Sequence, residues 1–221
     1  TSGRQVEPKN TAVAATSVFT RADIERLQVR TVDELLTRVP GVSVSRNGGP
    51  GSLTGVFMRG TSSTQSLVLV DGQRISSASS GTASLEFLSI DQIERVEVVR
   101  GSRSSLYGSD AIGGVIQIFT RRGSDHSAQP YARLAAGTHS TYERTLGVSG
   151  GDAATRYNLG GTLNESRGID NTGSDLGSNH DDDALRNRAL SMNLSHQFNE
   201  DFEAGFSALD QRGKTEWDDI Y

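Results

Sequence analysis

The chain has 221 residues, enough for one or two domains with a real hydrophobic core. It is 34% hydrophobic, and no stretch approaches the ~18 to 20 consecutive apolar residues of a membrane-spanning helix, which excludes helical membrane insertion. The formal net charge is −5 with no evident basic face, which argues against nucleic acid as a partner. The absence of cysteine excludes disulfides, thiolate metal sites and cysteine nucleophiles.

The first forty residues predict a polar arm, a strand and two short helices. Thr20 is the expected N-cap of the first helix, with Asp23 three residues on in a near capping box. Thr31 is the expected N-cap of the second helix, which Pro40-Gly41 ends. The predicted elements are the arm over 1–11, the strand over 12–19, and helices over 21–28 and 32–38.

The next eighty residues alternate short apolar runs with glycine-rich turns, which predicts strands. Ser66 to Val70 leads into Asp71-Gly72, a signal for a two-residue hairpin. Residues 47–51 form a loop of no ordinary hairpin length between runs at 42–44 and 56–58. The stretch from Val96 to Arg122 reads as two strands joined by a tightly folded Gly/Ser-rich connection that contains Tyr107.

Three motifs in this region occur in the order found in one family. They are T-x-x-[DE]-L-L-x-x-x-P-G-V from Thr31, [IV]-x-[IL]-R-G with V-L-[VI]-D-G between Val56 and Gly72, and R-G-x-x-S-x-x-Y-G-x-x-A-x-G-G from Arg100. Together they resemble the plug, or cork, domain of TonB-dependent outer-membrane receptors, against the alternative of a chance glycine-rich loop. The resemblance implies an α+β plug domain, a mixed small sheet with short helices, over residues 1–123.

From about residue 129 the sequence pattern changes to strand-length segments in which apolar and polar residues alternate. Examples are Tyr157 to Asn164 and Leu190 to Phe198. Such segments, near ten residues long, predict antiparallel transmembrane β-barrel strands, although a soluble sheet with one buried face is the alternative. About five strands over 124–221 would leave open edges in hydrocarbon, so we expect an incomplete part of a larger, 22-strand barrel. The implied location is the outer membrane of a Gram-negative bacterium, in contact with its lipid.

Within this family, the segments NGGPGSLTGVFMRGTSS and LVLVDGQRI are most similar to the sequences of the vitamin B12 receptors. The resemblance implies that cobalamin binds at outward-facing plug loops and is imported by coupling to TonB, whose binding box is mostly absent from this chain. Ferric-siderophore receptors share the bare motifs, and a non-transporting surface binding or toxin-docking protein is a further alternative. The implied ligand contacts, each of which could equally be an ordinary turn residue, are Ser52, Leu53, Gly55, Ser62, Ser79 and Ser80.

An acidic stretch suggests a cation site. Asp181 and Asp183 project to the same face of an extended segment, where like charges repel by roughly 1 kcal/mol at 4 Å in water. Ca²⁺, which takes 6 to 8 oxygen ligands in flexible geometry, suits such residues better than Mg²⁺ or Zn²⁺, although a solvated acidic loop is the alternative. The resemblance implies a loop-ordering calcium site with the ligands Asp170, Asn179, Asp181, Asp183 and Asp210.

The sequence lacks the motifs expected of an enzyme. It has no phosphate-binding loop, no complete nucleophile elbow around Ser104, and no H-E-x-x-H pair among its four histidines. We therefore expect no catalysis.

Overall fold

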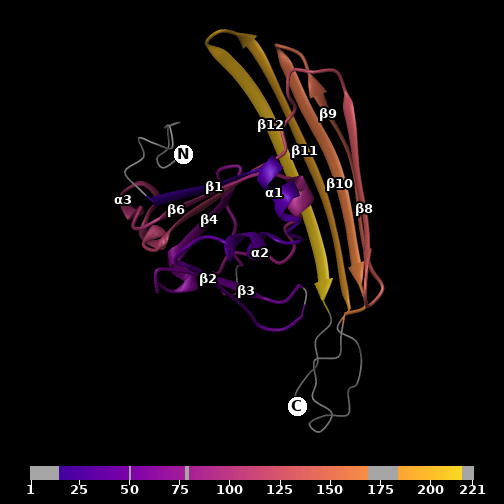
Figure 1. The fold of residues 1–221 in the computed structure, drawn as a ribbon. Helices are drawn as coiled ribbons and strands as arrows, with labels where there is room; N and C mark the ends of the chain where they lie inside the picture. The colour runs from indigo at the N-terminus through magenta and orange to yellow at the C-terminus, as the bar shows by residue number, and fades with distance from the viewer. Residues whose placement is uncertain (1–14, 50, 78–79, 169–183, 216–221) are drawn as a thin grey trace. The chain divides into compact units, whose positions relative to one another are not determined.

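The computed structural model describes residues 15–49, 51–77, 80–168 and 184–215, and these form two compact units. The first comprises the described residues up to Asn47 together with Leu53–Glu86 and Ile93–Thr120. The second comprises Gly48–Ser52, Phe87–Gln92 and the chain from Arg121 onward. Figure 1 shows the elements of each unit in chain order. Two short segments from the N-terminal half of the sequence thus group with the C-terminal strands.

A five-stranded mixed sheet organises the first unit, in the order β1-β6-β7-β4-β5. β4 and β7 pair in parallel, and the other neighbours pair antiparallel. All five residues of β4 are buried, as expected of a central strand that is covered on both faces. The strands are β1 (Ala15–Thr20), β4 (Ser66–Val70), β5 (Gln73–Arg74), β6 (Ile93–Arg100) and β7 (Gly114–Thr120).

Two short helices follow β1 where the sequence predicts them. α1 (Arg21–Leu27) has the capping box at Thr20 and Asp23 and ends at Gln28, which is left-handed. α2 (Val32–Leu36) starts from the Thr31 cap and is shorter than predicted. No helix among the described residues is long and apolar enough to cross a membrane.

Two hairpins complete the strands of the first unit. The Asp71-Gly72 turn joins β4 to β5, and both residues have positive φ, as the predicted two-residue turn requires. The Asp71 carboxylate also accepts hydrogen bonds from the backbone N–H (3.1 Å) and the hydroxyl of Thr120 on β7. β2 (Val42–Arg46) and β3 (Thr54–Met58) form a separate antiparallel pair. Residues 47–53 connect these two strands, and this connection is longer than an ordinary hairpin loop.

The stretch between β6 and β7 closes the core of the first unit. It contains α3 (Ser104–Tyr107) and a 3-10 turn, η3 (Ser109–Ala111). Tyr107 packs against a cluster of Leu67, Leu69, Ala111 and Val115, and its hydroxyl accepts a hydrogen bond from Gln117 Nε2 at 2.8 Å.

Two other residues of the R-G motif are structural as well. The Arg100 guanidinium donates to the carbonyls of Pro40 (2.8 Å) and Ala15 (3.3 Å), which holds three segments together. A Cβ on Gly114 would lie 2.4 Å from the Val99 carbonyl oxygen, so only glycine allows this approach of the two strands.

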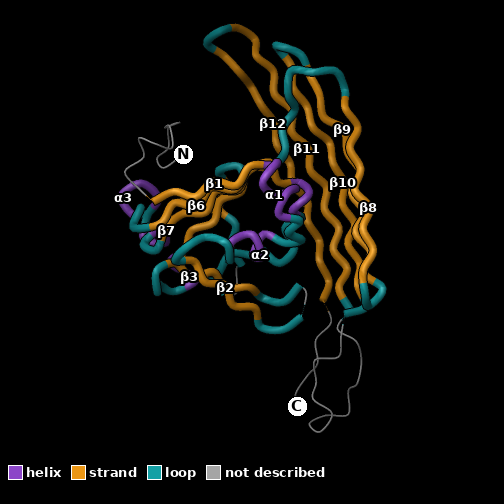
Figure 2. Tube along the Cα trace, in the orientation of Figure 1, coloured by secondary structure: helices purple, strands orange, loops and turns teal. Residues whose placement is uncertain are grey.

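The second unit is a five-stranded antiparallel sheet in the order β12-β11-β10-β9-β8. Its strands lie side by side (Figure 2) and are longer than those of the first unit. Their number and antiparallel pairing agree with the predicted barrel strands. They are β8 (Gln129–Gly137), β9 (Thr141–Gly151), β10 (Thr155–Ser166), β11 (Leu185–Asn199) and β12 (Phe202–Thr215).

The second sheet carries its apolar residues on the exposed face. On β11, Leu190, Met192 and Leu194 are 54%, 39% and 40% exposed, whereas Ser191 and Asn193 between them are buried. The same inversion occurs on β9 and β10, where the buried residues include Thr145, Asn158 and Thr162. A water-soluble sheet would bury the apolar face, so this pattern is that of barrel strands whose apolar face meets lipid.

Candidate functional site

Three of the predicted ligand-contact segments converge in the first unit. The first is the 3-10 turn η1 (Ser63–Gln65), which Ser62 opens: its backbone N–H donates to Gln65 Oε1 at 3.0 Å, and its hydroxyl lies 3.1 Å from that of Thr64. Ser62 and Thr64 are both exposed. The turn thus presents hydroxyl groups to solvent.

The second segment is a loop whose described residues are Ser77 and Ser80 to Thr82. The backbone N–H of Ser77 donates to the Thr82 carbonyl at 2.8 Å, and the hydroxyls of Ser80 and Thr82 lie 2.7 Å apart. A Cβ on Gly81 would lie 3.9 Å from Thr64 Cγ2, so this loop abuts η1.

The third segment is the start of β3. A Cβ on Gly55 would lie 3.7 Å from Ser63 Cβ, which places this strand beside η1. We call the resulting surface the hydroxyl patch, which consists of Ser62, Ser63, Thr64, Ser80 and Thr82. Its side chains are neutral and each can both donate and accept a hydrogen bond. The patch therefore suits a ligand edged with amides, hydroxyls or carbonyls and carrying little net charge.

The remaining predicted contacts are distributed differently. Leu53 is half-buried and its carbonyl accepts from the Asn47 N–H at 3.2 Å, inside the loop between β2 and β3. Ser52 is buried and belongs to the second unit. Ser79 lies outside the described residues. The structure therefore brings together Gly55, Ser62 and Ser80.

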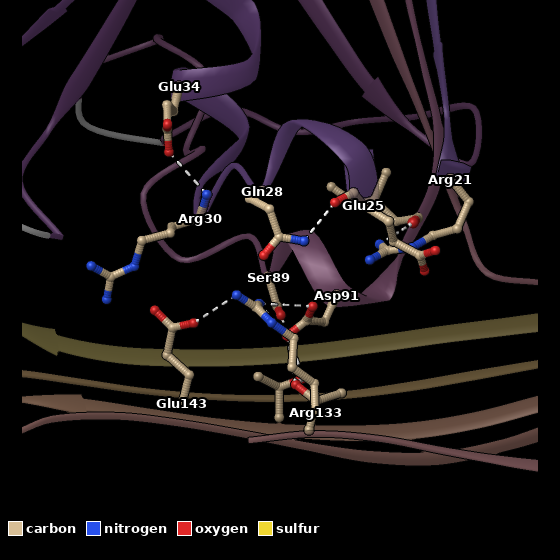
Figure 3. A network of polar contacts seen from close by, with 12 residues as sticks. Arg21, Glu25, Gln28, Arg30, Glu34, Ser89, Asp91, Arg133 and Glu143 are labelled. Atoms are coloured by element: carbon tan, nitrogen blue, oxygen red, sulfur yellow. Dashed lines mark hydrogen bonds and ion pairs between the residues drawn. The ribbon is translucent and has the colours of Figure 1, made fainter. Parts of the chain in front are cut away.

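A charged network in the second unit was not predicted from the sequence. It centres on Asp91, in the 3-10 turn η2 (Ile90–Gln92). The Asp91 carboxylate accepts from Arg133 on β8 at 3.0 and 3.1 Å and from the Thr145 hydroxyl on β9 at 2.7 Å (Figure 3). Arg133 also pairs with Glu143 at 3.2 Å. The network holds the segment Phe87–Gln92, which we call the strap, on the polar face of the sheet.

Hydrogen bonds at both ends of the strap extend this attachment. Asn187 Nδ2 on β11 donates to the Phe87 carbonyl at 2.8 Å, and the Ser89 hydroxyl donates to that of Thr162 on β10 at 3.4 Å. The Phe87 ring also lies against Gly213 on β12, where a Cβ would come within 1.9 Å of it. The strap thus contacts all five strands. These partners lie 42 to 100 residues apart in sequence, so no local pattern could have identified them.

The entry of the chain into the second sheet is also anchored. The Arg121 carbonyl accepts from Asn193 Nδ2 at 2.8 Å and from Asn158 Nδ2 at 3.3 Å. The Arg121 guanidinium lies 4.4 Å from the ring centre of Tyr131, whose hydroxyl donates to Asn158 Oδ1 at 3.0 Å. These contacts fix the position of Arg121 on the polar face of β10 and β11.

Three carboxyl groups outside the strands have shifted pKa values. On α1, the hydrogen bonds with the side chain and backbone of Thr20 lower the pKa of Asp23. Burial raises the pKa of Glu86, against smaller opposing effects of backbone hydrogen bonds. In the turn between β9 and β10, the backbone N–H groups of Thr155 and Ala154 donate to Asp152 and lower its pKa. Asp152 is therefore a turn-forming group, whereas burial makes Glu86 harder to ionise than an exposed glutamate.

The predicted calcium ligands lie mostly outside the described residues. This applies to Asp170, Asn179, Asp181 and Asp183. Asp210 is on β12, opposite Leu190, and pairs with Arg212 at 3.4 Å. Within the described ranges, no group of three or more His, Cys, Asp or Glu side chains is arranged to hold a metal ion.

Residues 8–115 match the family model described as the TonB-dependent receptor plug domain. The N-terminal half of the chain therefore matches the plug domain of TonB-dependent receptors, and antiparallel strands of the barrel type follow it. TonB-dependent receptors are proteins of the Gram-negative outer membrane, which is the location predicted from the sequence.

Solved receptor structures share the fold of both units. The siderophore receptor PirA of Acinetobacter baumannii is 24% identical with a TM-score of 0.70, over 91% of this chain and 32% of that one. PirA of Pseudomonas aeruginosa is 27% identical with a TM-score of 0.65, over 93% and 35%. The pyoverdine receptor FpvA of P. aeruginosa PAO1, bound to pyoverdine, is 19% identical with a TM-score of 0.73, over 90% and 27%.

This chain therefore spans about a third of the length of the solved receptors that it matches. The two PirA proteins are described as siderophore receptors and FpvA as a pyoverdine outer-membrane receptor; none of the three is described as an enzyme. The finer prediction, a similarity to vitamin B12 receptors in particular, receives no support from these matches.

Proposed function

We propose that this chain is the plug and first barrel strands of an outer-membrane receptor that imports a ferric siderophore by TonB-coupled active transport. The observation that carries the proposal is the plug-family match over residues 8–115, joined to a sheet that exposes its apolar face. Two of the solved receptors with the same fold are described as siderophore receptors and one as a pyoverdine receptor, and none as a cobalamin receptor, which favours the siderophore class over cobalamin.

The hydroxyl patch supports a substrate with little net charge. A ferric tris-hydroxamate is neutral because three hydroxamate anions balance Fe³⁺, whereas a ferric tris-catecholate carries three negative charges. Binding the catecholate complex would favour cationic side chains, and the five residues of the patch are all Ser or Thr. We therefore infer that a neutral, hydroxamate-type chelate is the preferred siderophore.

Cobalamin is the second candidate. It is large, uncharged overall and edged with amides, so the same neutral patch favours it. In this case the contacts would be Ser52, Leu53, Gly55, Ser62, Ser79 and Ser80.

Transport requires an energy source besides binding. A ligand shifts a conformational equilibrium only by its differential affinity for the two states, so a tightly held substrate is not released by its own binding. Coupling to TonB supplies this free energy in the proposal. A non-transporting binding or toxin-docking protein would need no such partner.

The test is substrate binding to the full receptor, with a ferric tris-hydroxamate, ferric enterobactin and cyanocobalamin compared by titration calorimetry. We expect the hydroxamate to bind tightest, and Ser62→Ala with Ser80→Ala to weaken binding about tenfold, since each lost neutral hydrogen bond costs about 0.5–1.5 kcal/mol. Ser43→Ala, at an exposed position on β2, is the matched control. Tightest binding of cyanocobalamin would replace the siderophore with the second candidate.

A transport assay separates the two kinds of receptor. Uptake of the bound ligand into cells should stop when TonB is deleted, while binding to the cell surface should remain. Undiminished uptake without TonB, or binding without any uptake, would contradict the transport proposal.

We also propose that calcium orders the segment that contains Asp170, Asn179, Asp181 and Asp183. Asp210 would join this set only by giving up its ion pair with Arg212. The test is calcium titration of the full receptor, in which Asp181→Ala with Asp183→Ala should abolish the binding heat. An unchanged binding heat would leave this segment a solvated acidic loop.

A further inference from the structure

The loop between β2 and β3 opens with Asn47-Gly48, which is the only Asn-Gly pair in the sequence. Both residues are exposed, and Asn47 directly follows Arg46, the last residue of β2. The backbone N–H of Asn47 donates to the Leu53 carbonyl at 3.2 Å, which holds the two ends of the loop together. The pair is therefore accessible to water at the end of a strand.

The fold requires glycine at position 48. The φ of Gly48 is +130°, in the region that favours glycine, and a Cβ there would lie 2.7 Å from Ser52 Oγ. Ser52 is buried, which restricts any movement of its hydroxyl. Asn47 is therefore followed by the one residue type whose backbone nitrogen has no side chain to shield it.

Two groups in this pair are free of hydrogen bonds. Among the described residues, the Asn47 carboxamide has no hydrogen-bond partner, and neither has the Gly48 N–H. A nucleophile in the same chain reacts without a bimolecular encounter, which lowers the entropic part of the barrel of activation required. The unshielded nitrogen and the unheld carboxamide therefore meet the requirements for closing a ring.

The Asp71-Gly72 turn provides a contrast within the same chain. It is the only Asp-Gly pair in the sequence, and a ring could form there in the same way. The Asp71 carboxylate, however, accepts hydrogen bonds from the backbone N–H of Thr120 at 3.1 Å and from the Thr120 hydroxyl. Glycine thus follows one side chain that is held and another that is not.

We propose that Asn47 is a site of spontaneous deamidation in the folded receptor. The Gly48 nitrogen forms a bond to Asn47 Cγ, and the bond from Cγ to Nδ2 breaks. The amide nitrogen leaves as ammonia, which carries away the proton of the Gly48 N–H, and a succinimide ring remains. Water then adds to either ring carbonyl and breaks its bond to the ring nitrogen, which yields aspartate or isoaspartate.

The reaction adds a charge to a neutral loop. Residues 47–53 contain no ionisable side chain, and both products carry a carboxylate where the Asn47 carboxamide stood. In isoaspartate the backbone also runs through the side-chain carbons, which lengthens the loop. The deamidated receptor is therefore a second covalent form, and its share increases with the time since folding.

The test is peptide mass spectrometry of the full receptor after ageing, either folded in detergent or unfolded in urea. Trypsin releases the peptides Asn47–Arg59 and Gly60–Arg74, which contain the two pairs. Digestion in heavy-oxygen water marks any deamidation that occurs during handling. Isoaspartyl methyltransferase with labelled S-adenosylmethionine measures isoaspartate in each peptide.

We expect Asn47–Arg59 to gain its acid forms in the folded receptor at a rate within about threefold of that in the unfolded receptor, because an exposed and unbonded site needs no opening. Isoaspartate at Asp71 should form about tenfold more slowly in the folded receptor, because its two hydrogen bonds to Thr120 must break first. Asn47→Gln is the matched variant. It keeps a neutral carboxamide one bond further from the Gly48 nitrogen, and the gain should be lost.

Deamidation of Asn47 that is slowed by folding as strongly as isoaspartate formation at Asp71 would overturn the proposal. Acid forms that arise only during handling, or an equal gain in Asn47→Gln, would overturn it as well. A gain in the folded receptor that is absent from Asn47→Gln and matches the unfolded rate supports it.

Discussion

Glu86 shows how burial of one side chain makes the stability of the protein depend on pH. Its Oε2 is buried without a hydrogen-bond partner among the described residues, and burial raises its pKa above the ordinary value of 4.5. The folded protein therefore holds this proton at pH values where the unfolded chain has lost it. The cost of ionising Glu86 is absent below pH 4.5 and grows as the pH rises towards the folded pKa.

We expect Glu86→Gln to remove this part of the pH dependence. The free energy of unfolding of the variant should exceed that of the wild type at pH 7–8 and match it near pH 4. Urea unfolding of the folded receptor at the two pH values measures this, with Glu94→Gln at an exposed position as the control. A gain of the same size at both pH values would show that the ionisation of Glu86 is not responsible.

At the scale of single elements, the polar face of β9 and β10 is shaped to receive an aromatic ring. Tyr131 on β8 lies over Gly147 and Gly160: a Cβ at Gly147 would come within 2.2 Å of its ring, and one at Gly160 within 2.5 Å of its hydroxyl. The bare backbone of these strands thus allows Tyr131 to reach Asn158 and to support the Arg121 guanidinium. The position of Arg121, where the chain enters the second sheet, therefore depends on the absence of side chains at Gly147 and Gly160.

We expect Gly147→Ala to displace Tyr131 and to destabilise the sheet by about 1–3 kcal/mol, as overpacking of a tight site does. Gly161→Ala is the matched control, because it is the same substitution on the neighbouring strand. Its Cβ would lie 4.0 Å from Leu190 Cδ1, which is an ordinary contact, on the other face of the sheet. Urea unfolding of the receptor and its variants measures both effects. If the two substitutions cost the same, the close contact with Tyr131 has no special role.

At the scale of the whole molecule, the strap joins residues from the N-terminal half of the sequence to strands from the C-terminal half. Its Asp91 is almost fully buried, whereas the Arg133 side chain is 34% exposed. Removing one partner of a buried ion pair costs ~3–5 kcal/mol, because the remaining charge stays uncompensated. Partial exposure of Arg133 reduces this figure.

We expect Arg133→Met to destabilise the receptor by about 2–3 kcal/mol and Asp91→Asn in the same chain to restore part of the loss. The measurement is a double-mutant cycle on the free energy of unfolding. Arg156→Met, at an exposed arginine, controls for the loss of a charge. Strictly additive effects of Asp91→Asn and Arg133→Met would show that the pair is not coupled.

Local patterns were enough to predict most elements of the fold. The caps at Thr20 and Thr31 depend on side chains three residues from their targets, and the Asp71-Gly72 turn depends on two residues only. Alternation along the last strands predicted which residues share a face, since neighbouring side chains of a strand point to opposite sides. The length of α2 was overestimated because the pattern continues past Thr37, where the helix ends.

Tertiary structure alone decided which residues meet. Ser62 and Ser80 lie close enough to form one patch because the chain folds back between them, and Asp91 finds Arg133 across 42 residues. Strand register alone places Arg188 on β11 opposite Arg212 on β12, and a slip of one residue would move one of the two side chains to the other face of the sheet. The sequence by itself therefore determined the plug family, the elements and their faces, whereas long-range pairing decided the sites, because hydrogen bonds and charges act through space and not along the chain.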